Sequence, residues 1–135
     1  MQFFLLTAVL LSVFQPQEKS KEDPLLRAAK EGLSDPTKPF TLVVRFKIKD
    51  GQGPKFEAAA VKAVKETRKE KGNLAYELSK TPKGPNYVIY ERWDNLPALE
   101  AHLKTDNYKT VAAAVKPLLE AEIDVDLLVP VPAAD

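Results

Sequence analysis

The residue types in this chain limit the chemistry it can perform, and two of the reactive ones occur once each. Trp93 and His102 both lie in the stretch YERWDNLPALEAHL, residues 90–103. A neutral imidazole, whose unperturbed pKa is about 6.5, can act as a general base toward a phenol or an enol. An indole ring can form a wall for a planar aromatic ligand. We therefore consider His102 as a base and Trp93 as a ring platform, against a structural hydrogen bond and core packing.

Three further residues are candidates for binding a small molecule near this pair. Tyr76 and Tyr87 alternate onto the same strand face as Trp93, where each hydroxyl could donate to a ligand or each ring could simply pack. Asn73 follows Gly72, so it is either a turn residue or an amide that orients a carbonyl. Arg45 faces the other way, and we expect it to pair with Glu77 or Glu91.

The composition argues against several classes of protein. The chain has no cysteine, one histidine and no acidic loop of the EF-hand type, so we expect neither thiol chemistry nor a metal held by the protein. Its 20 Lys and Arg nearly balance 19 Asp and Glu, which disfavours a nucleic-acid partner. It has no glycine-rich phosphate loop and no GxSxG motif. Its chemistry is therefore expected to need no metal.

Composition also divides the chain into segments. Residues 1–15 are expected to form an export signal or an apolar arm. A signal would make the protein exported, to the periplasm or outside the cell, with no stable membrane span in the mature protein; otherwise it would be cytoplasmic. Residues 16–39 read as a charged, proline-containing linker with a short helix from Asp23 to Gly32, to which we assign no chemistry. The predicted domain is 40–131, and residues 132–135 form a tail.

Hydrophobic periodicity predicts the elements that must position these side chains. Apolar residues occupy the even positions of 40–49, which indicates a strand with one buried face. A helix of about five turns should follow until Gly72, then a hairpin of strands 74–78 and 87–93, helices 95–103 and 107–117, and a strand 123–129. The order β-α-β-β-α-β predicts an α+β, ferredoxin-like fold with an antiparallel sheet.

The sheet face without helices is expected to be apolar. By alternation it carries Val43, Ala75, Val88, Tyr90 and Leu128. A second copy of the chain is the simplest cover for such a face, so we expect a homodimer.

Several segments together resemble one family. FTLVVRFKIKDGQGPKFEAA, EKGNLAYELSK, YVIYERWDNLPALEAHLKTDNYKTV and DVDLLVP look like the antibiotic biosynthesis monooxygenase family over roughly residues 40–130. The resemblance implies a dimeric α+β barrel with a pocket between sheet and helices in each subunit. Family members include oxygenases that act on quinols or polyketide aromatics without metal or flavin, haem-degrading enzymes and an isomerase of a phosphorylated sugar.

The resemblance can be tested at single positions. Residues that the haem-degrading branch uses are replaced here by Val44, His102 and Ala112, which disfavours haem breakdown. Ile89 stands where the polyketide branch has an asparagine four residues before the tryptophan matched by Trp93. His102 matches the helix histidine of the family. Asn107 stands where many members have a second histidine, and is a further candidate for substrate binding.

Three hypotheses follow. The first is a small cofactor-independent monooxygenase of the quinol-oxidising type, acting on a quinol or related aromatic molecule, with His102 and Trp93 as catalytic residues and Asn73, Tyr76, Tyr87 and Asn107 binding the substrate. The second is an isomerase of a small carbonyl compound, which would need a lysine near the pocket mouth to bind an anionic group. The third is a non-catalytic, exported dimeric protein that binds a ligand or serves in a stress response.

Overall fold

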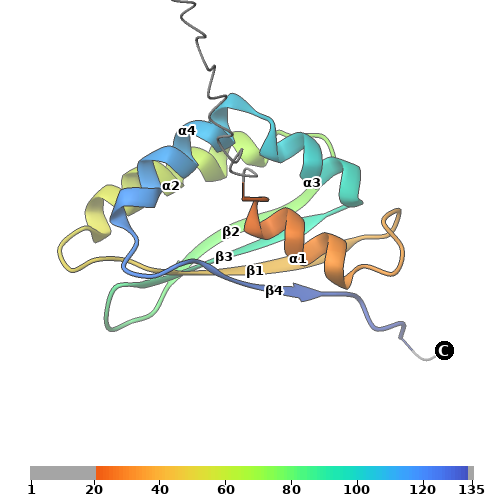
Figure 1. Ribbon diagram of the computed structural model, residues 1–135, viewed down its shortest axis with the longest axis horizontal. Coiled ribbons are helices and arrows are strands. Elements are labelled where there is room, and N and C mark those ends of the chain that lie inside the picture. The colour runs from red at the N-terminus through yellow and green to blue at the C-terminus, as the bar shows by residue number, and fades with distance from the viewer. Residues whose placement is uncertain (1–20, 134–135) are drawn as a thin grey trace, which may run out of the picture.

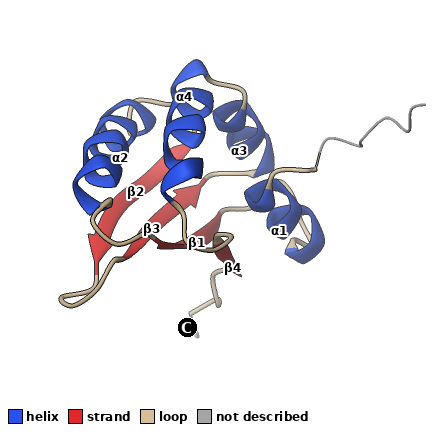
Figure 2. Ribbon diagram, turned by 60° about the vertical axis from the view of Figure 1, so that its left-hand side comes forward, coloured by secondary structure: helices blue, strands red, loops and turns tan. Residues whose placement is uncertain are grey.

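A four-stranded antiparallel sheet carries helices on one of its faces (Figures 1 and 2). The structure is a computed structural model that describes residues 21–133. The strands lie side by side in the order β2-β3-β1-β4. Their bounds are β1 Phe40–Lys47, β2 Asn73–Lys80, β3 Asn86–Trp93 and β4 Asp124–Leu128. This arrangement confirms the predicted α+β, ferredoxin-like fold.

The two-residue alternation of the central strands separates a buried face from an outer face. On β1, Phe40, Leu42 and Val44 are buried beneath the helices, as their even positions predict. On β3 the buried residues are Tyr87, Ile89, Glu91 and Trp93. Trp93 pairs with Phe40 in the β1–β3 register, so the largest aromatic residue closes one end of the core.

The helices begin where side-chain caps and prolines favour them. Their bounds are α1 Pro24–Gly32, α2 Gly53–Thr67, α3 Leu96–Leu103, α4 Asp106–Val115 and the 3-10 turn η1 Lys116–Leu118. Asn95 caps α3 by accepting a hydrogen bond from the Ala98 N–H, and Thr105 caps α4 through the Tyr108 N–H. The short α3–α4 connection holds His102 and Tyr108 on neighbouring turns.

The helix that was predicted to continue to Gly72 is shorter. α2 ends at Thr67, and the N–H groups of Lys69 and Glu70 then bond three residues back, to Glu66 and Thr67. Gly72 reverses the chain with φ of 84°, a value that favours glycine. Glu70 thus lies in a turn and not on the exposed face of a helix.

The segment before β1 is part of the packed structure. Leu25 and Ala29 of α1 belong to the main hydrophobic core, and Figure 2 shows α1 above the β1–β4 edge of the sheet. Within residues 21–133, no helix is long and apolar enough to cross a membrane. The predicted export signal, residues 1–15, lies outside the described residues.

The outer sheet face carries the expected apolar residues together with an unexpected ion pair. Tyr90 and Leu128 are 39% and 49% exposed there. Arg45 binds Asp126 at 2.6 Å and Asp124 at 3.4 Å on the adjacent strand β4. The prediction that Arg45 pairs with Glu77 or Glu91 was therefore wrong, because β4 lies directly beside β1 and Glu91 is buried on the opposite face.

Candidate active site

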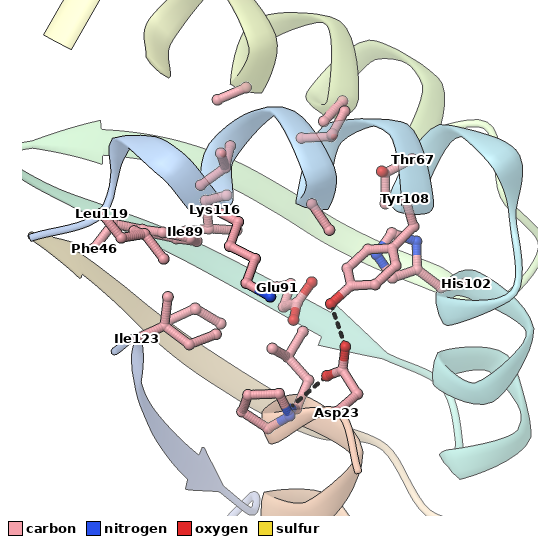
Figure 3. A pocket seen from close by; sticks show the side chains of 18 of the residues that line it. Asp23, Phe46, Thr67, Ile89, Glu91, His102, Tyr108, Lys116, Leu119 and Ile123 are labelled. Carbon is pink, nitrogen blue, oxygen red and sulfur yellow. Dashed lines mark hydrogen bonds between the residues drawn. The ribbon is translucent and has the colours of Figure 1, made fainter. Parts of the chain in front are cut away.

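A cavity of about 600 Å³ lies between the sheet and the helices (Figure 3). This volume is in the range of small-molecule sites. Apolar side chains from β1, β3, α2 and α4 form most of its walls: Val44, Phe46, Phe56, Ala60, Ala63, Ile89, Val111 and Val115. Polar side chains line one part of it: Asp23, Thr67, Tyr76, Glu91, His102, Asn107 and Tyr108.

His102 and Glu70 form a hydrogen-bonded pair at the polar part of the cavity. Nδ1 of His102 lies 2.8 Å from Oε2 of Glu70, and the imidazole is 2% exposed. Burial lowers the pKa of His102, although the charge of Glu70 opposes this shift. The ring is thus neutral near pH 7 and donates its Nδ1–H to Glu70. Its Nε2 lone pair is buried without a hydrogen-bond partner among the described residues, which suits a base.

Aromatic rings surround the imidazole and hold it in place. Trp93 lies with its ring centroid 4.8 Å from that of His102, and Tyr108 meets the imidazole edge-on at 5.0 Å. Tyr76 lies further away, at 6.0 Å. Trp93 does not line the cavity, so in this structure it supports His102 from behind. The role of Trp93 as a ring platform stays a prediction.

Glu91 places a carboxyl group in the same cavity. It is 1% exposed, and both of its oxygens lack a hydrogen-bond partner within residues 21–133. Burial raises the pKa of Glu91 to about 8, and the charges of Asp23 and Glu70 add to the shift. The neighbouring indole N–H of Trp93 partly offsets it, although its geometry falls short of a hydrogen bond. Glu91 is accordingly a neutral acid near pH 7.

Asp23 connects the α1 segment to the site. Its Oδ1 accepts the Leu25 N–H and so caps α1, while its Oδ2 accepts the hydroxyl of Tyr108 (Figure 3). Burial and the adjacent carboxylate raise the pKa of Tyr108 far above its usual value. Tyr108 is therefore a neutral phenol that donates its proton to Asp23.

Charged residues surround the open side of the cavity. Lys21 forms an ion pair with Glu122 at 2.8 Å, which joins the segment before α1 to the loop before β4. Arg27 and Lys116 are exposed residues that also line the cavity. A molecule that enters from this side passes several charges before it reaches the apolar interior.

The structure brings some predicted site residues together and separates others. His102, Tyr76 and Asn107 line the cavity, and Nδ2 of Asn107 is buried without a partner among the described residues. Tyr87 lies outside it, with its hydroxyl on Glu57 at 2.9 Å. Asn73 also lies outside, because its amide donates to the Ala75 carbonyl at a β-bulge. In this structure both side chains make hydrogen bonds within the protein outside the cavity, and their roles as pocket residues stay predictions.

Four residues of the site were not predicted from the sequence. Glu91 shares the alternation of Tyr87, Ile89 and Trp93, which was the available signal, but a glutamate is rarely buried. Glu70 falls in the segment that was predicted to be helical up to Gly72, whereas α2 ends at Thr67. Asp23 and Tyr108 are far apart in the sequence, and no local pattern joins them. Within residues 21–133, no group of three or more His, Asp or Glu side chains is arranged to hold a metal ion.

Comparison with known proteins agrees with the fold. Residues 39–114 match the model of the antibiotic biosynthesis monooxygenase family. The chain belongs to this family. The matched segment includes Glu70, Glu91, His102 and Tyr108, whereas Asp23 and α1 precede it.

Individual members of the family show how far the similarity extends. The chain is 31% identical over 87 residues to "Putative monooxygenase YcnE" of Bacillus subtilis (strain 168), covering 64% of this chain and 92% of that protein. The structure of Rv0793 from Mycobacterium tuberculosis superposes with a TM-score of 0.66 at 27% identity, over 72% of this chain and 99% of that one. A Caulobacter crescentus CB15 structure superposes with a TM-score of 0.68 at 22% identity, over 73% and 94% of the two chains, and supports the fold.

Proposed function

We propose that this protein is a monooxygenase that oxidises a quinol or a related phenolic aromatic molecule in the cavity. The observation that carries the proposal is the His102–Glu70 pair, which leaves the Nε2 lone pair of a neutral imidazole free at the cavity. Membership of the monooxygenase family supports the reaction class. The apolar walls favour a flat, hydrophobic substrate.

In this proposal His102 removes the proton of a substrate hydroxyl. Nε2 takes the proton, and the Glu70 carboxylate stabilises the imidazolium that forms. The resulting phenolate is electron-rich and supplies electrons to molecular oxygen. For a quinol the overall reaction is quinol plus O₂ giving hydroxyquinone plus water. Four electrons pass to O₂: two from oxidation of the quinol to the quinone and two from conversion of a ring C–H to C–OH.

Oxygen uptake by the purified full-length protein tests this proposal. The substrates are a panel of hydroquinones and naphthols, each measured beside its autoxidation blank. His102→Ala should lower the rate about 10²- to 10⁴-fold, the usual contribution of a general base. Lys104→Ala, an exposed position beside the same helix, is the control and should keep the rate.

The Glu70→Gln variant sharpens the assignment. Glutamine keeps an oxygen that accepts the Nδ1–H but removes the charge that stabilises the imidazolium, so its rate should fall between those of the wild type and His102→Ala. Uptake no faster than the blank for every phenol would overturn the proposal. Full activity in a folded His102→Ala variant would overturn the role of His102.

The cationic residues at the open side support a second candidate. An isomerase acting on an anionic carbonyl compound needs a cation near the mouth, and Lys21, Arg27 and Lys116 line the cavity there. This reaction consumes no oxygen. Product formation from such a compound under strictly anaerobic conditions would favour it over the monooxygenase.

We further propose that two copies pair through the outer sheet face. Support comes from the exposed Tyr90 and Leu128 and from the half-buried Val43 and Val88 on that face. Light scattering of the full chain should give twice the monomer mass, and Tyr90→Asp should give a folded monomer. A wild-type monomer at high concentration would contradict the pairing.

A further inference from the structure

We propose that Glu91 is a substrate-binding residue whose carboxyl group donates a hydrogen bond to a carbonyl oxygen of the bound molecule. This inference deepens the proposed function and rests on it for the identity of the substrate, but its test requires only binding. The Glu91 carboxyl group would thus favour aromatic molecules that carry an acceptor oxygen over hydrocarbons of the same shape.

The first argument is the isolation of the carboxyl group. Glu91 extends from the middle strand pair of the sheet into the cavity, and Figure 3 shows its oxygens among the lining side chains. It is almost fully buried, and neither oxygen has a hydrogen-bond partner among residues 21–133. A buried polar group without a partner is costly, and natural proteins usually tolerate it where a ligand completes the bonding.

The second argument is the protonation state that the surroundings impose. Asp23 at the start of α1 and Glu70 in the turn after α2 both raise the pKa of Glu91 through their charges. Tyr76 on β2 and Tyr108 on α4 are neutral phenols, and His102 on α3 is a neutral imidazole. The Trp93 indole favours the ionised form, by a smaller amount than burial favours the neutral one. The cations Lys21, Arg27 and Lys116 line the same cavity, and Figure 3 shows the Lys116 side chain extending toward Glu91. Near neutral pH the group is a carboxylic acid, which has one O–H to donate.

The third argument is the position of Glu91 relative to His102. Both side chains line one cavity, and they offer opposite functions: a lone pair on Nε2 of His102 and an O–H on Glu91. A molecule with a hydroxyl at one place and a carbonyl oxygen at another can satisfy both. A hydrocarbon of the same size would leave both groups unpaired. Sites with buried polar groups strongly reject ligands that cannot pair with them.

A matched pair of probes tests the inference without turnover. The probe α-tetralone carries a ketone on a bicyclic skeleton, and tetralin has the same skeleton without oxygen. Binding to the full-length protein is followed through the fluorescence of Trp93, the only tryptophan in the chain. Titrations at about pH 6 and about pH 10 place Glu91 in its neutral and ionised forms.

Four results are expected. Wild-type protein binds tetralone roughly three- to tenfold more tightly at the lower pH, the ratio that one hydrogen bond provides. Glu91→Gln keeps an N–H donor and binds tetralone without that pH dependence. At both pH values Glu91→Leu binds tetralone three- to tenfold more weakly than wild type does at the lower pH. Tetralin, which cannot pair with Glu91, binds wild type no more tightly than it binds Glu91→Leu. As a control, Glu57→Gln, a change outside the cavity, behaves as wild type.

The inference is overturned if, at about pH 6, folded Glu91→Leu binds tetralone as tightly as wild type does. It is also overturned if the pH dependence persists in Glu91→Gln, because another group would then be its cause. Circular dichroism of each variant establishes that it is folded. Since neither probe is a quinol or a phenol and only binding is measured, loss of the oxygenase hypothesis would leave this result intact, and a negative binding result would leave the oxygenase hypothesis intact.

Discussion

The hydrogen bonding of polar side chains differs between the two ends of the layer between sheet and helices. At the end that contains Tyr87, the hydroxyl donates to Glu57, which also binds Lys80 at 3.1 Å. At the end that contains the polar part of the cavity, Nδ1 of His102 and the hydroxyl of Tyr108 are paired, but several other buried polar atoms have no hydrogen-bond partner among the described residues. They belong to Thr67, Glu91, Trp93, His102 and Asn107.

The contrast separates packing from binding within one core. Buried polar groups are normally paired, so a group of unpaired ones in a single place indicates a site that a ligand completes. The same residue types occur at both ends, a tyrosine and a glutamate, and only their surroundings differ. Four predictions test this contrast, from the largest expected effect to the smallest.

The largest effect concerns the pH dependence of stability. The folded-state pKa of Glu91, about 8, lies above its unfolded value of 4.5, so the folded state binds the extra proton between these values. Its contribution to stability is fully present below about pH 4.5 and is lost as pH rises to about 8, by up to about 5 kcal/mol. Urea unfolding at several pH values should show that Glu91→Gln abolishes this loss. The pKa of His102 is lowered in the folded protein, so this residue reduces stability as pH falls below its unfolded pKa of about 6.5. This effect is the same in wild type and in Glu91→Gln.

The second effect tests the paired end. Ile48 is fully buried there beside Phe56 and Tyr87, so Ile48→Ala should lower the free energy of unfolding by about 2–4 kcal/mol through the cavity it creates. Urea denaturation measures this loss. The folded variant should bind α-tetralone as wild type does. Val61→Ala, at a position 46% exposed, is the control and should change stability little.

The third effect concerns the link from α1 to the cavity. Tyr108→Phe removes the hydroxyl that donates to Asp23 and should cost about 1–3 kcal/mol, since the acceptor is a partly buried carboxylate. Denaturant unfolding measures this loss beside that of Tyr87→Phe. The loss in Tyr87→Phe should be smaller, because Glu57 keeps its ion pair with Lys80. Equal losses in the two variants would contradict the contrast between the two ends.

The smallest effect is expected on the outer sheet face. Arg45 bonds to Asp124 and Asp126 in an exposed setting, where ion pairs contribute little. In the Tyr90→Asp monomer, Arg45→Ala should leave the unfolding midpoint and α-tetralone binding nearly unchanged. A larger loss of stability is expected in the paired wild type, because the proposed contact between two copies would remove water from this ion pair.

Local patterns in the sequence predicted most of the fold. The alternation on β1, β2 and β3 predicted that Phe40, Tyr76 and Trp93 face the helices, whereas Glu91 was expected to pair with Arg45 on the other face. Caps and prolines located the starts of α1 and α3. The helix before Gly72 was predicted too long because the change to a three-residue hydrogen-bond spacing after Thr67 leaves no mark on the hydrophobic pattern.

The sequence by itself determined the element order, the sheet faces and the presence of one imidazole near one indole. Only the tertiary structure decided which side chains complete the site. It sets Glu70 on Nδ1 of His102, buries Glu91 and joins Asp23 to Tyr108 across 85 residues of chain. The physical reason is that periodicity records how each segment meets water, whereas the pairing and protonation of buried polar groups depend on neighbours from distant segments.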